Sequence, residues 1–224
     1  MIIGFHGGLT PIRDSLSLLQ VDHVKEPKNW ELVEKAQFCY SAGFFITVSP
    51  ESIKAVSRHC CENNKVYIMN ISAPFICQVP PFKACLMDTM PYIDFLFGNE
   101  NEFTEFAKSE GWDHEDLKKV ALKTAALPKA SGNRCRTVII TQGCDPTIIA
   151  RDGLVKEYPV EKVSKSSIVD TNGAGDAFVG GFITGLLKNR EIEECCRSGN
   201  YAASRVIQQS GCTLPEKCEF AFSA

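Results

Sequence analysis

The segment DTNGAGDAFVGGF, residues 170–182, brings together flexible backbone, a carboxylate and the start of an apolar helix. Gly173 and Gly175 allow backbone angles that other residues avoid, so successive N–H groups can point into one concavity. The helix expected to begin here adds its unpaired N–H groups and the positive end of its dipole, which together suit a phosphate. Asp176 borders this concavity, where a positive environment favours an ionised carboxylate that can accept a hydroxyl proton. The segment therefore predicts a phosphate site beside a base.

Two other glycine motifs do not fit the segment. Phe178 occupies the third glycine position of G-x-G-x-x-G, which excludes the dinucleotide-binding fingerprint. No Lys-Ser or Lys-Thr pair follows the glycines, which excludes a Walker A loop. The plain alternative is a helix that is merely entered through glycines. It accounts less well for Asp176, for the preceding Asp170 and Thr171, and for the buried strand expected upstream.

These residues need a scaffold, and strand-like and helix-like segments alternate along the chain. Strands are expected at 36–48, 66–72, 94–99 and 136–143, with a hairpin near a sheet edge at 147–160. Helices are expected at 49–64, 100–111, 113–127, 174–188 and 191–209, and a loop at the Pro-rich stretch 77–85. The alternation predicts an α/β fold of three layers, a mainly parallel sheet with helices on both faces. In such sheets ligands bind beyond the carboxyl ends of the strands, where NIS, GNENE, TQG and DTNGAGD are expected.

Composition and cysteine usage exclude several classes of protein. The formal net charge of −3 argues against a dedicated binder of nucleic acid or of anionic membranes. No segment approaches the ~18 apolar residues of a membrane span, and the opening MIIGFHGGLT does not fit a secretory signal. The eleven cysteines are odd in number and contain no C-x-x-C. We therefore expect reduced, mostly buried thiols in a cytosolic protein, with neither a zinc ribbon nor a disulfide framework.

The glycine segment resembles the signature of the ribokinase-like (phosphofructokinase-B) carbohydrate and nucleoside kinases. Further stretches are similar to the members that act on adenosine, namely YSAGFFITVSPES, NISAPF, PYIDFLFGNENE, TQG and GNYAASRVIQQSGCTLPEK. The resemblance runs from about Asn29 to about Lys217. It implies the ribokinase-like fold and phosphorylation of the 5′-hydroxyl of adenosine to AMP in purine salvage, with ATP as co-substrate and Mg²⁺ as cofactor.

The resemblance also implies a role for each matching residue. Asp176 would be the base that takes the proton from the 5′-hydroxyl. The residues implied to bind ATP are Asn172, Gly173, Ala174 and Gly175 at the transferring phosphoryl group, Thr141 and Gly143 along the nucleotide, and Asn200 and Ser204 beside its base. Those implied to meet the other ligands are Asn99 and Glu102 for magnesium and its waters, and Phe44 and Phe75 for the adenosine ring.

Structural alternatives exist for several of these pairs. Phe44 and Phe75 lie in apolar runs, where core packing is the default. Asn99 and Glu102 have the spacing of a capping box at a helix start. Asn200 and Ser204, implied to lie beside the ATP base, are one helical turn apart and also fit a polar helix face. These alternatives remain open at the level of the sequence.

The resemblance divides the chain into a divergent segment, residues 1–28, and a nucleoside kinase core, residues 29–224. The N-terminal strands, a ribose-clamping glycine pair and a small β lid of the family are expected to be missing, which would lower the activity of the chain by at least ~10²-fold. Lys165 stands where related kinases carry a glutamine near the nucleoside. The resemblance also implies a monomer that binds adenosine and ATP, with no nucleic-acid or membrane partner. Its implied location is the cytoplasm, with the nucleus as a second compartment.

Two other functions remain open. One is a related sugar kinase, against which Phe44 and Phe75 argue, because a flat purine rewards ring stacking and a small sugar does not. The other is a truncated, non-catalytic form that at most binds nucleotide.

Overall fold

The computed structural model describes residues 2–5, 9–11, 21–213 and 217–223. The chain forms two compact units, unit 1 (Met1–Ile140 and Ile149–Val155) and unit 2 (Thr141–Ile148 and Lys156–Ala224). It therefore passes from one unit to the other after Ile140, after Ile148 and after Val155. Within the described ranges, no helix combines the length and the apolar character that crossing a membrane requires.

The described strands form one eight-stranded sheet in the order β2-β1-β3-β4-β5-β6-β7-β8. Their bounds are β1 Ile2–Phe5, β2 Leu9–Pro11, β3 Phe38–Ala42, β4 Val66–Asn70, β5 Phe95–Asn99, β6 Thr137–Gln142, β7 Asp145–Arg151 and β8 Leu154–Tyr158. Strand β4 is parallel to both β3 and β5, with Phe38 opposite Val66 and Ile68 opposite Phe95. Strand β1 is antiparallel to β2 and β3. The predicted α/β class with a mainly parallel sheet is confirmed.

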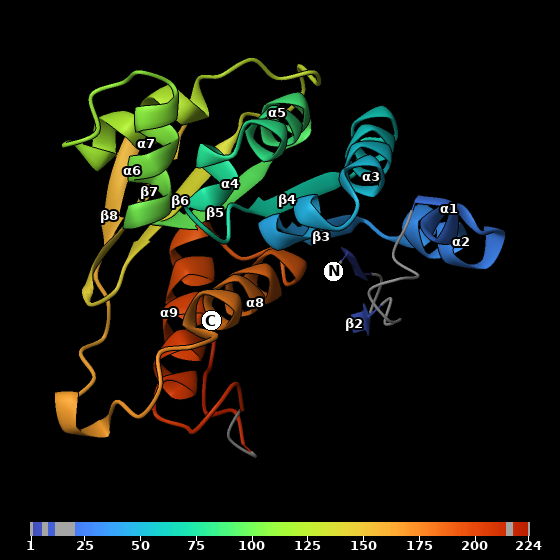
Figure 1. The fold of residues 1–224 in the computed structure, drawn as a ribbon. Coiled ribbons are helices and arrows are strands. Elements are labelled where there is room, and N and C mark those ends of the chain that lie inside the picture. Colours follow the sequence, from blue (N-terminus) through green and yellow to red (C-terminus); the bar gives the residue numbers. More distant parts are fainter. Residues whose placement is uncertain (1, 6–8, 12–20, 214–216, 224) are drawn as a thin grey trace. The chain divides into compact units, whose positions relative to one another are not determined.

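The helices of unit 1 precede or follow its parallel strands along the chain. They are α1 Val21–Lys25, α2 Pro27–Lys35, α3 Pro50–Glu62, α4 Phe75–Gln78, α5 Pro80–Thr89, α6 Glu100–Ser109 and α7 Leu117–Ala125, with short 3₁₀ helices η1 Gly43–Thr47 and η2 Met90–Tyr92. Figure 1 shows α3 to α7 along one side of strands β3 to β5. Apolar residues of these helices, among them Ile53 and Val56 of α3 and Phe103 and Phe106 of α6, are fully buried. Burial of these side chains is the main force that holds the helices on the sheet.

The expected strand at 36–48 is wrong in its second half. Strand β3 ends at Ala42, and residues 43–47 form η1. A Cβ atom at Gly43 would lie only 2.0 Å from the carbonyl oxygen of Ile71, so glycine is needed where the chain leaves the sheet. The Gly43 N–H donates to Ser72 Oγ at 2.8 Å, which replaces the ladder hydrogen bond. Aromatic and β-branched residues favour strands, so the composition of residues 43–48 predicts a strand where the chain turns.

The Pro-rich stretch 77–85, expected as a loop, is mostly helical. Helix α4 ends at Gln78, and Pro80 and Pro81 open α5. Proline is tolerated in the first turn, because the N–H groups there have no partner within the helix. Proline therefore marks a helix start here, and not an irregular segment.

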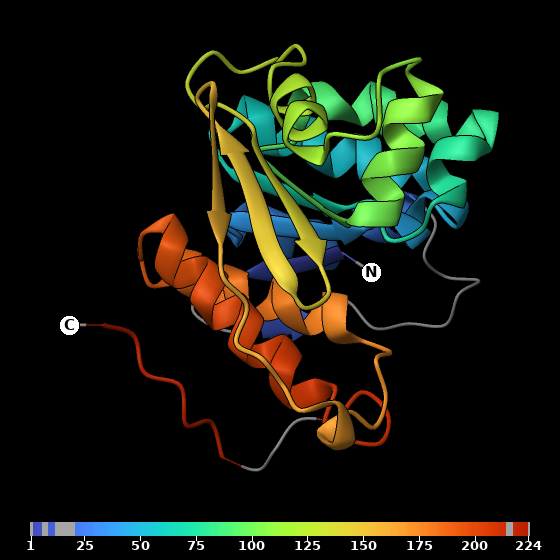
Figure 2. The ribbon, with the colours of Figure 1, turned by 90° about the vertical axis from the view of Figure 1, so that its left-hand side faces the viewer.

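Unit 2 contains the turn between β6 and β7, the 3₁₀ helix η3 Lys165–Ser167, and the helices α8 Ala174–Leu187 and α9 Ile192–Val206. Both long helices match the predicted ones within a few residues. The predicted hairpin is also present, and Figure 2 shows β7 and β8 side by side. Its turn residues Asp152 and Gly153 have φ of 53° and 73°. The predicted position at a sheet edge is confirmed, because β8 ends the strand order.

All eleven cysteines are free thiols, as the odd count and the spacing predict. Six are buried, Cys39, Cys60, Cys77, Cys85, Cys195 and Cys196, while Cys61 is intermediate and Cys135, Cys144, Cys212 and Cys218 are exposed. The expectation of buried thiols is therefore right for about half of them.

Candidate functional site

The glycine segment forms a tight turn that ends in the first turn of α8. The Asn172 N–H donates to Asp170 Oδ1 at 2.9 Å, so Asp170 forms the turn, as expected for an aspartate at this position. Gly173 is the N-cap residue of α8 and has a left-handed φ of 78°. The Ala177 N–H donates to the Gly173 carbonyl at 2.9 Å, which is the first helical hydrogen bond. Glycine is needed at 173 because other residues rarely adopt this angle.

Backbone donors are left open at this turn. The Ala174 N–H donates to the Thr171 carbonyl at 3.3 Å. Among the described residues, no hydrogen-bond acceptor faces the N–H groups of Gly173, Gly175 and Asp176. They lie at the positive end of the 14-residue helix α8. Open backbone donors at the positive end of a helix suit an anion, and the binding of a phosphate here stays a prediction.

The Asp176 carboxyl lies in the first turn of α8, beside these donors. The side chain remains solvent-accessible. Partial burial nevertheless raises the pKa of Asp176 above its ordinary value. A carboxylate with a raised pKa binds a proton more tightly, which strengthens it as a base.

Helix α8 is fixed against α9 through glycines. A Cβ atom at Gly181 would lie 2.4 Å from the Ser198 carbonyl oxygen, and one at Gly199 would lie 2.8 Å from the Phe178 carbonyl oxygen. At Gly185 the added atom would lie 2.7 Å from Cys195 Sγ. These contacts let the two backbones approach closely and so hold the glycine turn in register with α9.

Asn200 and Ser204 lie on α9, and both are buried. Asn200 Oδ1 accepts a hydrogen bond from Thr147 Oγ1, and Asn200 Nδ2 donates to the Pro159 carbonyl, both at 3.5 Å. Ser204 Oγ donates to the Tyr201 carbonyl at 2.7 Å. Asn200 therefore links α9 to two other segments of unit 2, while Ser204 bonds within its own helix. Their roles beside a nucleotide base stay predictions.

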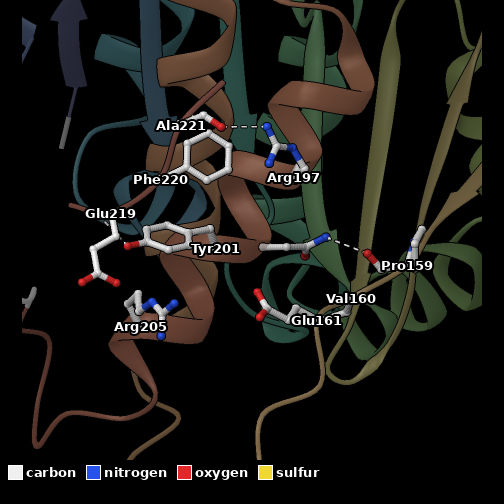
Figure 3. A pocket seen from close by; sticks show the side chains of 10 residues that line it. Pro159, Val160, Glu161, Arg197, Tyr201, Arg205, Glu219, Phe220 and Ala221 are labelled. Carbon is white, nitrogen blue, oxygen red and sulfur yellow. Dashed lines mark hydrogen bonds between the residues drawn. The ribbon is translucent and has the colours of Figure 1, made fainter. Parts of the chain in front are cut away.

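A cavity of about 520 Å³ opens beside Asn200 (Figure 3). Its walls come from the segment after β8, from α9 and from the C-terminal segment, with lining residues Pro159, Val160, Glu161, Arg197, Asn200, Tyr201, Arg205, Glu219, Phe220 and Ala221. Arg205 Cζ lies 4.8 Å from the Tyr201 ring centroid. Within the described ranges, Arg205 has no carboxylate partner. A cationic group on an aromatic face suits an anionic or aromatic ligand.

The C-terminal segment, residues 217–223, is held on α9 by several contacts. Arg197 Nη2 donates to the Ala221 carbonyl at 2.8 Å, as the dashed line in Figure 3 marks. The Phe220 ring lies 5.3 Å from the Tyr201 ring, centroid to centroid, and 4.6 Å from Arg197 Cζ. The Glu219 N–H donates to Tyr201 Oη at 3.0 Å. These residues close one wall of the cavity, and sequence reasoning missed them. The i, i+4 pair Tyr201 and Arg205 is the signal that was present.

Thr141 and Gly143 lie at the end of β6 and in the turn that follows it. Gly143 has φ of 59° and no atom within 4 Å of the position of an added Cβ. Both residues belong to unit 2, as do the glycine turn, Asn200 and Ser204. The structure therefore brings the predicted phosphate and ATP residues into one unit, while their contacts with a nucleotide stay predictions.

The two predicted aromatic residues of the nucleoside site contact each other in unit 1. The ring centroids of Phe44 and Phe75 are 5.8 Å apart, with an angle of 52° between the ring planes. Phe44 is 53% exposed, so core packing does not account for it. Phe75 also packs on Phe82, at 6.0 Å between ring centroids. Because the rings touch, a flat ligand would lie on the exposed face of Phe44 and not between the two rings.

Asn99 and Glu102 form the capping box of α6. Asn99 Oδ1 accepts from the Glu102 N–H, and Glu102 Oε2 accepts from the Asn99 N–H, both at 2.9 Å. Glu102 Oε1 also accepts from Asn99 Nδ2 at 3.1 Å. The structural alternative for this pair is thus present, and a metal role stays a prediction. In the part of the chain that the structure describes, no group of three or more His, Cys, Asp or Glu residues could hold a metal ion.

Comparison with known proteins adds a family and several relatives. The profile of pfkB family carbohydrate kinases matches residues 13–218. Adenosine kinases 2 and 1 of Arabidopsis thaliana are 53% and 52% identical to this chain over 219 residues, which are 98% of this chain and 63% of theirs. The crystal structure of Anopheles gambiae adenosine kinase in complex with P1,P4-di(adenosine-5) tetraphosphate has a TM-score of 0.82 at 43% identity, over 88% of this chain and 58% of that chain. For Schistosoma mansoni adenosine kinase in complex with 2-fluoroadenosine the TM-score is 0.84 at 34% identity, with the same coverage of 88% and 58%. The chain thus spans less than two thirds of the length of these relatives.

Proposed function

Because this chain belongs to the pfkB family of carbohydrate kinases, we propose that the protein transfers the γ-phosphoryl group of ATP to the 5′-hydroxyl of adenosine, giving AMP and ADP. The identity of 53% to an adenosine kinase of Arabidopsis thaliana supports this substrate. The observation that carries the proposal is the glycine turn, which combines open backbone N–H groups and the Asp176 carboxyl in one turn of helix.

The proposed reaction is an in-line displacement at phosphorus. The 5′-oxygen of adenosine forms a bond to the γ-phosphorus as the bond between that phosphorus and the bridging oxygen of ADP breaks. The Asp176 carboxylate takes the proton of the hydroxyl. The N–H groups of the turn from Gly173 to Gly175 donate to the charged oxygens of the group in transfer, and Asn172 bounds the same turn. Because these donors are set by the backbone, little reorganisation is needed during the reaction.

The adenine of ATP is proposed to bind at α9, beside Asn200 and Ser204. The cavity of about 520 Å³ at Asn200 supports this assignment, because its size lies within the usual range for small-molecule sites. Thr141 and Gly143, in the same unit, are proposed to contact the nucleotide along its length.

The adenosine ring is proposed to lie on Phe44, with Phe75 supporting that ring from behind. The exposure of Phe44, 53%, supports this role, because a large apolar ring left in water gains most from a stacked ligand. The same observation disfavours a sugar kinase, whose small polar substrate would not cover the ring.

Magnesium is proposed to act with ATP by neutralising phosphate charge. Mg²⁺ usually keeps several waters and is bound through one or two carboxylates together with substrate phosphates. Asn99 and Glu102 are proposed to hold metal-bound water, because carboxylate and amide oxygens suit the hydration shell of Mg²⁺. A monomeric state and a cytoplasmic location, with the nucleus as a second compartment, complete the proposal.

The test is an assay with purified protein, ATP and Mg²⁺, in which ADP formation is coupled to a spectrophotometric readout and AMP is identified by chromatography. Adenosine, ribose and fructose 6-phosphate are compared as acceptors, with Asp176→Asn as the matched inactive control. We expect phosphorylation of adenosine far above that of the sugars. Comparable rates on ribose would favour a sugar kinase, and ATP binding without transfer to any acceptor would favour a non-catalytic form.

A further inference from the structure

The segment that follows α9 packs against the turn that precedes α8, within unit 2. The N–H groups of Val169 and Asp170 donate to the Ile207 carbonyl at 2.9 and 3.3 Å. Further along the same segment, Cys212 Sγ lies 3.7 Å from the Asn172 carbonyl oxygen, at a distance suited to an S–H···O hydrogen bond. The glycine turn is therefore held from behind by residues about forty positions later in the sequence.

Cys212 also fills the space next to Gly173. A Cβ atom at residue 173 would lie 2.5 Å from Cys212 Sγ and 3.3 Å from Cys212 Cβ. The Cys212 thiol thus lies next to Gly173, the residue of the turn with a left-handed φ. It also donates to the carbonyl of the preceding residue, Asn172.

These two contacts act on a single peptide group. The Asn172 carbonyl and the Gly173 N–H belong to the same planar trans peptide, in which the C=O and the N–H point in opposite directions. A hydrogen bond that turns the carbonyl toward Cys212 therefore turns the Gly173 N–H away from Cys212. Rotation of this peptide by half a turn would present a carbonyl, and not an N–H, to a bound phosphoryl group.

We propose that Cys212 is a positioning residue for phosphoryl transfer, which it serves by fixing the Asn172–Gly173 peptide so that the Gly173 N–H faces the anion. This inference rests on the proposed function, in which the turn holds the group in transfer. Cys212 touches neither substrate nor reacting atoms. It acts through the orientation of one backbone donor.

The test compares three substitutions in the purified protein. Cys212→Ser keeps a hydroxyl donor, Cys212→Ala removes the donor, and Cys212→Val replaces the sulfur with apolar bulk. Cys135→Ala is the control, since Cys135 is also exposed but belongs to unit 1. We expect Cys212→Ala and Cys212→Val to lower kcat by roughly 3- to 10-fold, the equivalent of one neutral hydrogen bond, with an unchanged KM for adenosine. Cys212→Ser should remain within about twofold of the original protein.

Amide hydrogen exchange supplies a readout that does not require turnover. Peptides covering residues 169–178 are followed by mass spectrometry with and without ADP. We expect Cys212→Ala and Cys212→Val to exchange faster here than the original protein, and Cys135→Ala and Cys212→Ser to match it. Unchanged kcat and unchanged exchange in Cys212→Val would overturn the proposal, as would a Cys212→Ser variant as impaired as Cys212→Ala. A protein without kinase activity would overturn the proposed function, while the exchange data would still decide whether Cys212 fixes the turn.

Discussion

Asp176 is the residue on which the proposed chemistry depends most. We expect Asp176→Asn to lower kcat by ~10² to 10⁴, the usual range for loss of a positioned base, and to leave ATP affinity almost unchanged. Steady-state kinetics and calorimetric titration with ATP measure the two effects. Asp152→Asn, at an exposed aspartate in the β7–β8 turn, is the control for the chemical change. Near-normal turnover in Asp176→Asn would rule out the assignment.

A thermal melt of Asp176→Asn separates loss of chemistry from loss of fold. Burial raises the pKa of the Asp176 carboxyl in the folded protein, so folding favours the protonated form. The ionised carboxylate therefore costs stability at pH values above the raised pKa. For this reason we expect the neutral asparagine variant to melt at the same temperature as the original protein or at a higher one.

The same shift predicts a pH dependence of activity. The base works in its deprotonated form, so kcat/KM for adenosine should fall as the pH decreases through the pKa of Asp176 in the enzyme form that binds adenosine, which is the ATP complex at saturating ATP. Because that pKa is raised by burial, we expect the acid limb of the profile above the ordinary aspartate value of 3.8. The profile is measured at saturating ATP. An acid limb at or below the ordinary value would contradict the assignment of this limb to Asp176.

Phe44 tests the nucleoside site. If the adenosine ring stacks on this exposed ring, Phe44→Ala should raise KM for adenosine by the equivalent of about 1–3 kcal/mol, the range for loss of base stacking. The KM for ATP should not change. Leu154→Ala is the control, because Leu154 is another exposed apolar residue, 66% accessible. Equal KM values for adenosine in the two variants would remove Phe44 from the site.

At the scale of elements, the close approach of α8 and α9 determines where the glycine turn lies relative to the rest of unit 2. Gly181→Ala would place a methyl group 2.4 Å from the Ser198 carbonyl oxygen. The helices must then separate, and we expect a loss of about 1–3 kcal/mol in the free energy of unfolding, as for other overpacked sites. Urea denaturation measures this change.

The adjacent Gly180 provides a matched control for that substitution. It lies in the same helix, is exposed, and has no atom within 4 Å of the position of an added Cβ. Gly180→Ala should leave stability unchanged or raise it by up to about 1 kcal/mol, because alanine loses less backbone entropy in a helix. A similar loss in both variants would contradict the assignment of the Gly181 effect to packing against Ser198, because Gly180 has no such contact.

Elements whose signals are local could be predicted from the sequence. The helices that follow polar caps and the hairpin with Asp152 and Gly153 at its turn were predicted because capping and turn chemistry act over a few residues. The 3₁₀ turn at Gly43 could not be predicted, since it depends on the Ile71 carbonyl oxygen, which only the folded sheet brings near. Prolines 80 and 81 misled for a different reason, because proline marks both loops and helix starts.

The same distinction applies to the candidate site. The anion-binding turn with Asp176 is contained in seven consecutive residues, and its geometry follows from their types. The cavity beside Asn200 needs Pro159, Tyr201 and Phe220, which lie far apart in the sequence and meet only after folding. Their residue types do not predict that they come together in the fold. The contact between Cys212 and Gly173 could not be predicted for the same reason.

At the scale of the whole molecule, unit 2 is not a continuous piece of the chain. Thr141–Ile148 belong to unit 2, and Thr147 within this segment donates to Asn200 of α9. We therefore expect residues 156–224 alone to lack a cooperative thermal transition, whereas residues 141–224 should retain more helical circular dichroism. Both fragments are compared at equal concentration. A cooperative melt of residues 156–224 would show that residues 141–148 are dispensable for the folding of the helices.

This interleaving has a consequence for the order of events on the ribosome. All of unit 1 has been synthesised once Val155 has left the peptidyl transferase centre, whereas Thr141–Ile148 must wait for α9 before their own partners exist. During that interval the turn between β6 and β7 has been synthesised, but its partner helix α9 has not. Nascent chains stalled where this turn, but not α9, has left the exit tunnel should therefore expose the turn to a protease, and chains stalled after α9 has cleared the tunnel should protect it. Protein synthesis, and not only thermodynamics, would then decide when the contacts between Thr141–Ile148 and α9 first form.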